Sequence, residues 1–293
     1  MSTRFVRTSL AVAFLGASLT AQLSFRNAQD LPDGQREGFI RALNVGDFSV
    51  QELALPERAG DAISVDVVLD GRQHRLDLLP YSVRAADFKL LVEDETGIHE
   101  VEAPPPTTYR GTVAGVTGSV VAANLVDGQL EAQIMMSRDL PMLGIQPASP
   151  IDDTASRTAH LIYTSRDNLP SHATCGTADV DNHDHEHQPF GGSDDSGPQL
   201  GVQGYDLVEI ACDADREFYQ ANGSSVNNTE NDVENIINGV ASVYETEIGI
   251  TYEITAILVR TAEPDPYGSS GASSLLGQFA NHWSNNQQSI QRD

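Results

Sequence analysis

The sequence predicts a multidomain protein in which a β-rich domain is followed by a β-α-β-α unit of an α/β domain. Three observations lead to this prediction. Short alternating stretches separated by Asp-Gly turns recur from about residue 39 to residue 163. A stretch rich in Pro, Gly and acidic residues follows over residues 165–204. From Tyr205 onward, two strand-like runs alternate with two stretches of helical periodicity.

Residues 1–21 have the pattern of a secretory signal peptide. Arg4 and Arg7 form a basic start, a short apolar core begins at Leu10, and the small residues that end at Ala21 fit a cleavage site. We therefore expect a secreted or extracellular protein. The apolar core is too short to span a bilayer, and we see no later stretch of about 18 apolar residues that would predict a membrane anchor.

Residues 22–164 are expected to form an antiparallel β sandwich or an open barrel. The segment 63–69 alternates apolar and polar residues, Asp70-Gly71 indicates a tight hairpin, and the alternation resumes over 75–79. Regular short strands with turns between them are typical of such all-β folds. Further strands are predicted at 88–92, 110–113, 119–125 and 129–134, with an Asp127-Gly128 turn before the last.

Residues 205–293 carry the helical signals. We expect strands at 205–212 and 250–259, with a helix at 228–246 between them that Asn228 or Thr229 caps, and a second helix at 270–283. Two strands joined by an amphipathic helix form a βαβ unit, which predicts parallel strands and a right-handed crossover. The apolar positions of the first helix fall on one face: Val233, Ile236, Ile237, Val240, Val243 and Tyr244.

A sheet of only two strands is small, because sheets usually contain about four to six. We therefore expect the edge of the strand at 250–259 to lack a partner. We expect the same of the apolar face of the second helix, which carries Leu275, Leu276 and Phe279.

Residues 165–204 have the composition of a flexible linker, and this linker contains the candidate metal ligands. These are Cys175, His183, His185 and His187, since thiolates and imidazoles bind Zn, Ni or Cu. A polar linker that simply contains His is the alternative. Cys175 and Cys212 are the only cysteines, so a bond between them, a free Cys212 and a Cys212 paired elsewhere all stay open.

The charge balance bears on partners. The chain has 17 Lys and Arg residues against 42 Asp and Glu residues, a formal net charge of −25. Such a surface repels the phosphates of nucleic acids and anionic lipids. We therefore expect no nucleic-acid partner and no binding to anionic membranes.

The segment from Tyr205 to Tyr219, YDLVEIACDADREFY, resembles the opening strand of a reprolysin-like (adamalysin, metzincin) metallopeptidase domain. The segment 241–250 resembles the end of the first helix in that family, and 263–267, EPDPY, resembles its bacterial branch. Upstream, the Asp70-Gly71 hairpin and the segments 109–116, 119–122 and 127–134 resemble, in the same order, the propeptide of such zymogens.

The resemblance implies a secreted zinc metalloendopeptidase precursor that hydrolyses protein or peptide substrates. Residues 22–164 would be its inhibitory propeptide and 205–293 the first, truncated part of its catalytic domain. The family binds zinc through HExxHxxGxxH, a motif absent from these residues, so the zinc ligands are expected downstream and no catalytic residue is assigned here. Cys175-Gly176 resembles the cysteine switch of metallopeptidase propeptides, in which a thiolate occupies the fourth zinc position.

Three further interpretations remain from the residues themselves. Glu263, Asp265 and Tyr267 fit either a calcium site or a simple turn, and we favour the turn. The chain as a whole also fits a non-catalytic secreted binding protein, in which the β-rich domain recognises a partner. A His-rich extracellular metal-binding protein is the other alternative.

Overall fold

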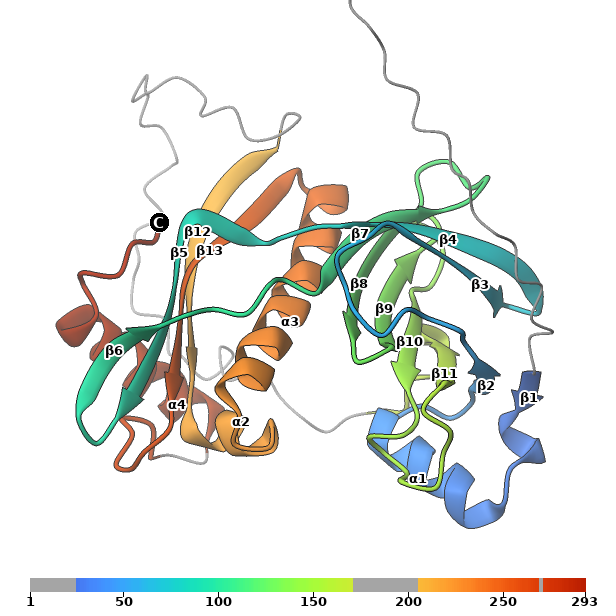
Figure 1. The fold of residues 1–293 in the computed structure, drawn as a ribbon, viewed down its shortest axis with the longest axis horizontal. Coiled ribbons are helices and arrows are strands. Elements are labelled where there is room, and N and C mark those ends of the chain that lie inside the picture. The colour runs from blue at the N-terminus through green and yellow to red at the C-terminus, as the bar shows by residue number, and fades with distance from the viewer. Residues whose placement is uncertain (1–24, 171–204, 269–270) are drawn as a thin grey trace, which may run out of the picture.

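The computed structural model describes residues 25–170, 205–268 and 271–293. The expected signal peptide, at 1–21, and most of the expected linker lie outside the described residues. The described chain forms two β-sheets that lie side by side, and helix α3 (Val226–Glu247) lies between them (Figure 1). This helix contacts strands of both sheets, which makes it the centre of the molecule.

The larger sheet has nine antiparallel strands in the order β1-β2-β11-β10-β9-β8-β7-β4-β3, and it curls on itself (Figure 1). A β-rich antiparallel fold for this region is thereby confirmed. The strands are β1 (Phe25–Asn27), β2 (Ser49–Glu52), β3 (Ile63–Leu69), β4 (Arg72–Pro80), β7 (Thr108–Val113), β8 (Val120–Val126), β9 (Gln129–Met135), β10 (Leu143–Pro147) and β11 (Ala159–Thr164).

Both predicted Asp-Gly turns connect neighbouring strands of this sheet. Asp70 and Gly71 have φ of 48° and 71°, and Asp127 and Gly128 have φ of 49° and 75°. Two successive residues in the left-handed region define the turn that matches the twist of a two-residue hairpin. The inner face of the curled sheet is apolar, with a core of 17 buried residues.

A second cluster of buried apolar side chains lies beside the N-terminal helices. The short 3₁₀ helix η1 (Ala28–Asp30) and α1 (Asp33–Leu43) pack at one end of the nine-stranded sheet, where η2 (Ser165–Asp167) also lies. Phe39 of α1 meets Phe48 edge to face, with ring centroids 5.7 Å apart. Such aromatic pairs add to the stabilisation that burial provides.

The smaller sheet has the order β12-β13-β5-β6. Its strands are β12 (Asp206–Ala214), β13 (Ile250–Arg260), β5 (Arg84–Asp94) and β6 (Gly97–Val101). Strands β12 and β13 are parallel, as predicted. The hairpin β5–β6 leaves the nine-stranded sheet after β4, crosses over to β13, and returns at β7 (Figure 1).

The expectation that the 250–259 strand has an unpaired edge is therefore wrong. Strand β5 pairs with it in parallel, so the backbone groups of that edge find partners. The segment 88–92, expected in the first β domain, belongs to β5 and thus to the second sheet.

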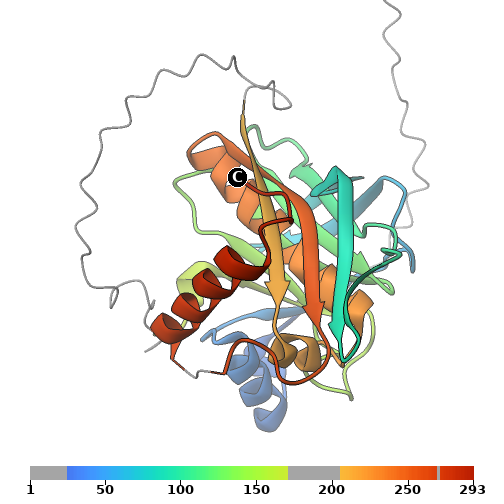
Figure 2. The same cartoon turned by 90° about the vertical axis from the view of Figure 1, so that its left-hand side faces the viewer.

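Three helices accompany this sheet: α2 (Arg216–Ala221), α3 and α4 (Ala272–Asn286). Figure 2 shows α4 in front of β12 and β13, and α3 behind them. The predicted cap of α3 is wrong, because Ser225 is the N-cap and accepts a hydrogen bond from Asn228 N at 3.3 Å. On α4, Leu276 and Phe279 are exposed, as expected, but Leu275 is half-buried and Trp283 is buried.

Candidate functional site: the two junctions of helix α3 and strand β5

Helix α3 buries a face that its apolar pattern did not indicate. Of the predicted stripe, Val233 is buried, but Ile236, Val240 and Tyr244 are 47%, 38% and 40% exposed. The side chains that are buried instead are largely polar: Thr229, Glu230, Glu234, Asn238 and Ser242. Buried polar groups require partners, and strands from both sheets supply them.

The first set of partners lies at the beginning of β5. The Arg84 guanidinium donates to the carboxylates of Glu230 and Glu234 and to the carbonyl oxygen of Pro104 at 2.8 Å. The side chains of both glutamates are almost fully buried, and that of Arg84 is 12% exposed. The Arg84 guanidinium also stacks over the ring of Phe88, 4.8 Å from its centroid. The ion pairs from Arg84 to the two glutamates join β5 to α3, whereas Phe88 lies on β5 itself.

Two carboxylates share one guanidinium at this position. Burial, and next the charge of Glu234, raise the pKa of Glu230 to about 8, while Arg84 acts in the opposite direction. Glu230 is therefore mostly protonated at neutral pH. One carboxylate oxygen of each glutamate, Oε2, has no hydrogen-bond partner among the described residues.

A separate cluster of charged side chains lies at the end of β5 and joins it to β13 and β12. The Arg260 guanidinium on β13 donates to Glu93 of β5, and to Asp213 of β12 at 2.7 and 2.8 Å. Asp213 also accepts from the Tyr267 hydroxyl at 2.5 Å and from Trp283 Nε1 at 2.7 Å. Burial, and then the hydrogen bond to Asp213, raise the pKa of Tyr267, which keeps its phenol protonated as a donor.

The junction between α3 and the nine-stranded sheet is also polar. Asn238, fully buried, donates to the carbonyl oxygens of Tyr109 and Ala123, each at 3.1 Å. Arg110 donates to the carbonyl oxygen of Asn238 at 2.8 Å and to Glu245 at 3.2 Å. Further amide contacts follow the helix: Asn124 to Asn231 at 2.8 Å and Asn235 to Glu131 at 2.6 Å.

This composition has a physical meaning. Interfaces between parts of a chain that can move apart are more polar than permanent ones, which resemble a sectioned core. Charged groups that separate at such an interface are rehydrated, whereas in a core they would stay buried without partners. Polar and charged contacts thus join α3 to the nine-stranded sheet and β5 to β13, beside the apolar cluster that Leu90 of β5 forms with Ile254 and Ile257 of β13.

The predicted ligands Cys175, His183, His185 and His187 lie outside the described residues, so their role stays a prediction. Cys212 is half-buried on β12 and forms no disulfide with a described residue. Burial, and next the charge of Asp213, raise the pKa of its thiol to about 12. A protonated thiol is a poor nucleophile and a poor metal ligand.

The segment 263–267 uses its polar groups within a turn. Glu263 accepts from the Arg216 guanidinium at 2.7 Å, and Asp265 accepts from the backbone N–H groups of Arg216 and Tyr267 at 3.1 and 2.9 Å. Within the part of the chain that the structure describes, no three His, Cys, Asp or Glu side chains are close enough to hold a metal ion.

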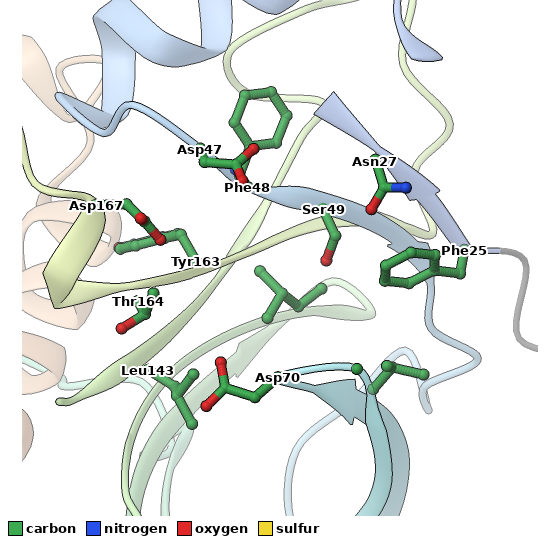
Figure 3. A pocket seen from close by; sticks show the side chains of 13 residues that line it. Phe25, Asn27, Asp47, Phe48, Ser49, Asp70, Leu143, Tyr163, Thr164 and Asp167 are labelled. Carbon is green, nitrogen blue, oxygen red and sulfur yellow. The ribbon is translucent and has the colours of Figure 1, made fainter. Parts of the chain in front are cut away.

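A cavity of about 170 Å³ lies between the two ends of the nine-stranded sheet. Figure 3 shows Asp70 across this cavity from Asp47 and Asp167. Its remaining walls are mostly apolar and include Phe48, Leu143, Tyr163 and other side chains. Asp47, Asp70 and Asp167 thus bring three carboxylates to a hollow of a size that a small ligand could enter.

Searches of protein-family models and of curated proteins return no match for this chain. Among the described helices, none has the length and apolar character needed to cross a membrane. The sequence analysis did not single out Arg84, Arg110 and Arg260. The one signal that could have identified them is that basic residues are scarce in this acidic chain.

Proposed function

We propose that the chain is part of the precursor of a secreted zinc metalloendopeptidase. In this proposal, residues 22–164 act as an inhibitory propeptide and residues 205–293 begin the catalytic domain. The observation that carries it is the polar junction through which a β-rich N-terminal part holds a parallel βαβ unit. A propeptide needs such a contact, because it must bind tightly before cleavage and leave afterwards.

The resemblance of the segment 205–219 to the opening strand of reprolysin-like enzymes supports the same proposal. The proposal requires an HExxHxxGxxH motif in residues that follow Asp293 in the gene, since the present residues lack it. We therefore assign no residue of this chain to peptide-bond hydrolysis.

Reading the gene beyond Asp293 is the direct test. We expect the motif there, and we expect the longer product to cleave casein in a chelator-sensitive way once the N-terminal part is removed. Replacing the motif Glu by Gln should abolish that cleavage, because this residue is the general base of the family motif. Residues 22–293 alone should show none. A longer gene without the motif, or zinc-dependent cleavage by residues 22–293, would contradict the proposal.

The proposal assigns the inhibitory thiolate to Cys175. A precursor that carries Cys175→Ala should be active before any cleavage, whereas Cys212→Ser should stay inactive, because the buried, protonated Cys212 thiol is not available to a metal. Thiol labelling of the intact precursor shows whether the two cysteines are bonded. A Cys175→Ala precursor as inactive as its parent would remove this part of the proposal.

One observation favours a second candidate, a non-catalytic secreted binding protein. The cavity in Figure 3 combines apolar walls with a few polar groups, as a small binding site does. In this alternative the gene carries no zinc motif and the purified protein carries no zinc. Elemental analysis of the natural protein separates the two candidates.

A further inference from the structure

Strand β5 is bound to β13 along its backbone. Ile254 N donates to the carbonyl oxygen of Val83 at 2.7 Å, and Thr261 N donates to that of Glu93 at 2.9 Å. Between these positions the two strands run in parallel with a register shift between Ile254 and Ala256, after which Lys89 lies opposite Ala256 and Glu93 opposite Arg260. Backbone pairing of this kind supplies affinity without regard to sequence.

Successive side chains of β5 face opposite sides of the sheet, which makes the pairing selective for sequence. Leu90 is buried in the apolar cluster that contains Ile254 and Ile257 of β13. Lys89 and Leu91, its neighbours on β5, line a hollow beside β13 and the C-terminal segment instead. An extended strand thus presents alternate residues to two different environments, one apolar and one mixed.

The two ends of the pairing carry opposite charge requirements. Near the beginning of β5, Glu230 and Glu234 of α3 form ion pairs with Arg84. Near the end, β13 presents Arg260, which takes the acidic Glu93. A strand that ran in the opposite direction would place its acid beside the charge of Glu234 and its base beside Arg260. Like charges at close range are strongly unfavourable, so the charges select a parallel strand.

The hairpin that carries β5 is a separate arm of the nine-stranded sheet. Strands β5 and β6 pair with each other, and β5 pairs with β13, while their chain neighbours β4 and β7 pair together in the large sheet. Separation of the arm from β13 would thus keep the strand order of the large sheet, and it would expose Val83 and Leu90, which are buried beside Ile254 and Ile257.

We infer that the β13 edge, with α3 at one end and Arg260 at the other, is a binding site for an extended peptide. The peptide lies parallel to β13, with a basic residue at its N-terminal end, an acidic residue nine positions later, and an apolar residue three positions before the acid. Strand β5 occupies the site in the intact chain. This site does not depend on the peptidase proposal, because it requires no zinc and no cleavage.

Hydrogen exchange of the full chain, followed by mass spectrometry, tests the site. The variant Glu93→Gln weakens the contact between the end of β5 and Arg260, and it leaves Arg260 bonded to Asp213, so the fold should persist. We expect the amides of β13 to exchange about tenfold faster, which matches the loss of one charge-assisted hydrogen bond. The amides of β8 and β9 should be unchanged and serve as an internal reference for folding.

The probe is a synthetic peptide of residues 82–103, added in excess to the Glu93→Gln variant. It should restore the protection of β13, whereas the same peptide with Arg84→Glu and Glu93→Arg should not. The matched control is Arg75→Gln, which breaks an exposed pair with Asp77 in the large sheet and should leave β13 unaffected. Unchanged exchange in β13 of the Glu93→Gln variant would overturn the inference, as would equal rescue by the two peptides.

Arg84→Gln provides the second measurement, at the other end of the strand. It removes the cation that binds Glu230 and Glu234, and β13 should again lose protection. Loss of protection in β13 together with unchanged exchange in β8 and β9 supports the site. Equal loss in both sheets would show that β5 is an inseparable part of one fold, and it would overturn the inference.

Discussion

The side chain of Gln51 closes the nine-stranded sheet onto Val68. Its Nε2 donates to the carbonyl oxygen of Val68 at 2.7 Å, and its Oε1 accepts from the N–H of Val68 at 2.8 Å. Gln51 lies on β2, near one end of the strand order, and Val68 lies on β3, at the other end. A single buried amide thus satisfies both backbone groups of Val68 and holds the curled sheet together.

Gln51→Leu should destabilise the chain by about 1 to 3 kcal/mol, because it leaves the N–H and the carbonyl of the half-buried Val68 without their partners. Urea unfolding of the full chain measures the change. Gln73→Leu is the matched control, since Gln73 is exposed and pairs with Val68 from the other side, on β4. Equal midpoints for Gln51→Leu and Gln73→Leu would show that the side-chain bridge contributes nothing.

Asn238→Ala should weaken the junction between α3 and the nine-stranded sheet. The variant leaves the carbonyl oxygens of Tyr109 and Ala123 without their donor, so we expect a loss of about 2 to 3 kcal/mol. Its control is Asn227→Ala in the first turn of the same helix, where the side chain is exposed. Urea unfolding of both variants, monitored by tryptophan fluorescence, measures the difference in their free energies of unfolding. Equal values would show that Asn238 is dispensable.

Much of the fold was predictable because its signals are local. The Asp70-Gly71 and Asp127-Gly128 hairpins follow from two residues that accept positive φ between alternating strands. The parallel pairing of β12 and β13 follows from an amphipathic stretch between two strand-like runs. These signals require no knowledge of the rest of the chain.

The pairing of β5 with β13 was not predictable in this way. The segment 88–92 is a short apolar run like its neighbours, and nothing within it indicates which sheet it joins. Its partner depends on Arg84 meeting Glu230, 146 residues later. The buried face of α3 was missed for the same reason, since counting apolar positions gives no weight to a glutamate or asparagine that a distant strand satisfies.

Two glycine substitutions should have opposite effects. A Cβ at Gly111 on β7 would lie 2.1 Å from the backbone oxygen of Asp77 on the paired strand β4, so Gly111→Ala must separate the strands. A Cβ at Gly38, inside α1, meets no atom within 4 Å. We expect Gly111→Ala to lower stability by at least ~2 kcal/mol, and Gly38→Ala to raise it by about 0.5 to 1 kcal/mol. Thermal unfolding of the two variants provides the measurement, and a neutral Gly111→Ala would contradict the close strand contact.

Glu230→Gln should make the chain more stable at high pH. The pKa of Glu230 is raised to about 8 from its ordinary 4.5, chiefly by burial, so the fold favours the protonated acid. Stability linked to this group is therefore fully present below about pH 4.5, falls as the pH rises toward 8, and stays low above it. A glutamine keeps the neutral form at every pH, and this part of the pH dependence should disappear.

Urea midpoints of the full chain at pH 5 and pH 9 test this prediction. At pH 5 wild-type Glu230 is already protonated, so the variant should differ little from the parent. At pH 9 the variant should be more stable by roughly 1 to 3 kcal/mol. Glu95→Gln is the control, because Glu95 is exposed between β5 and β6 and should give the same small difference at both pH values. If the gap between Glu230→Gln and the parent is the same at pH 5 and pH 9, then burial beside Glu234 does not hold a proton on Glu230.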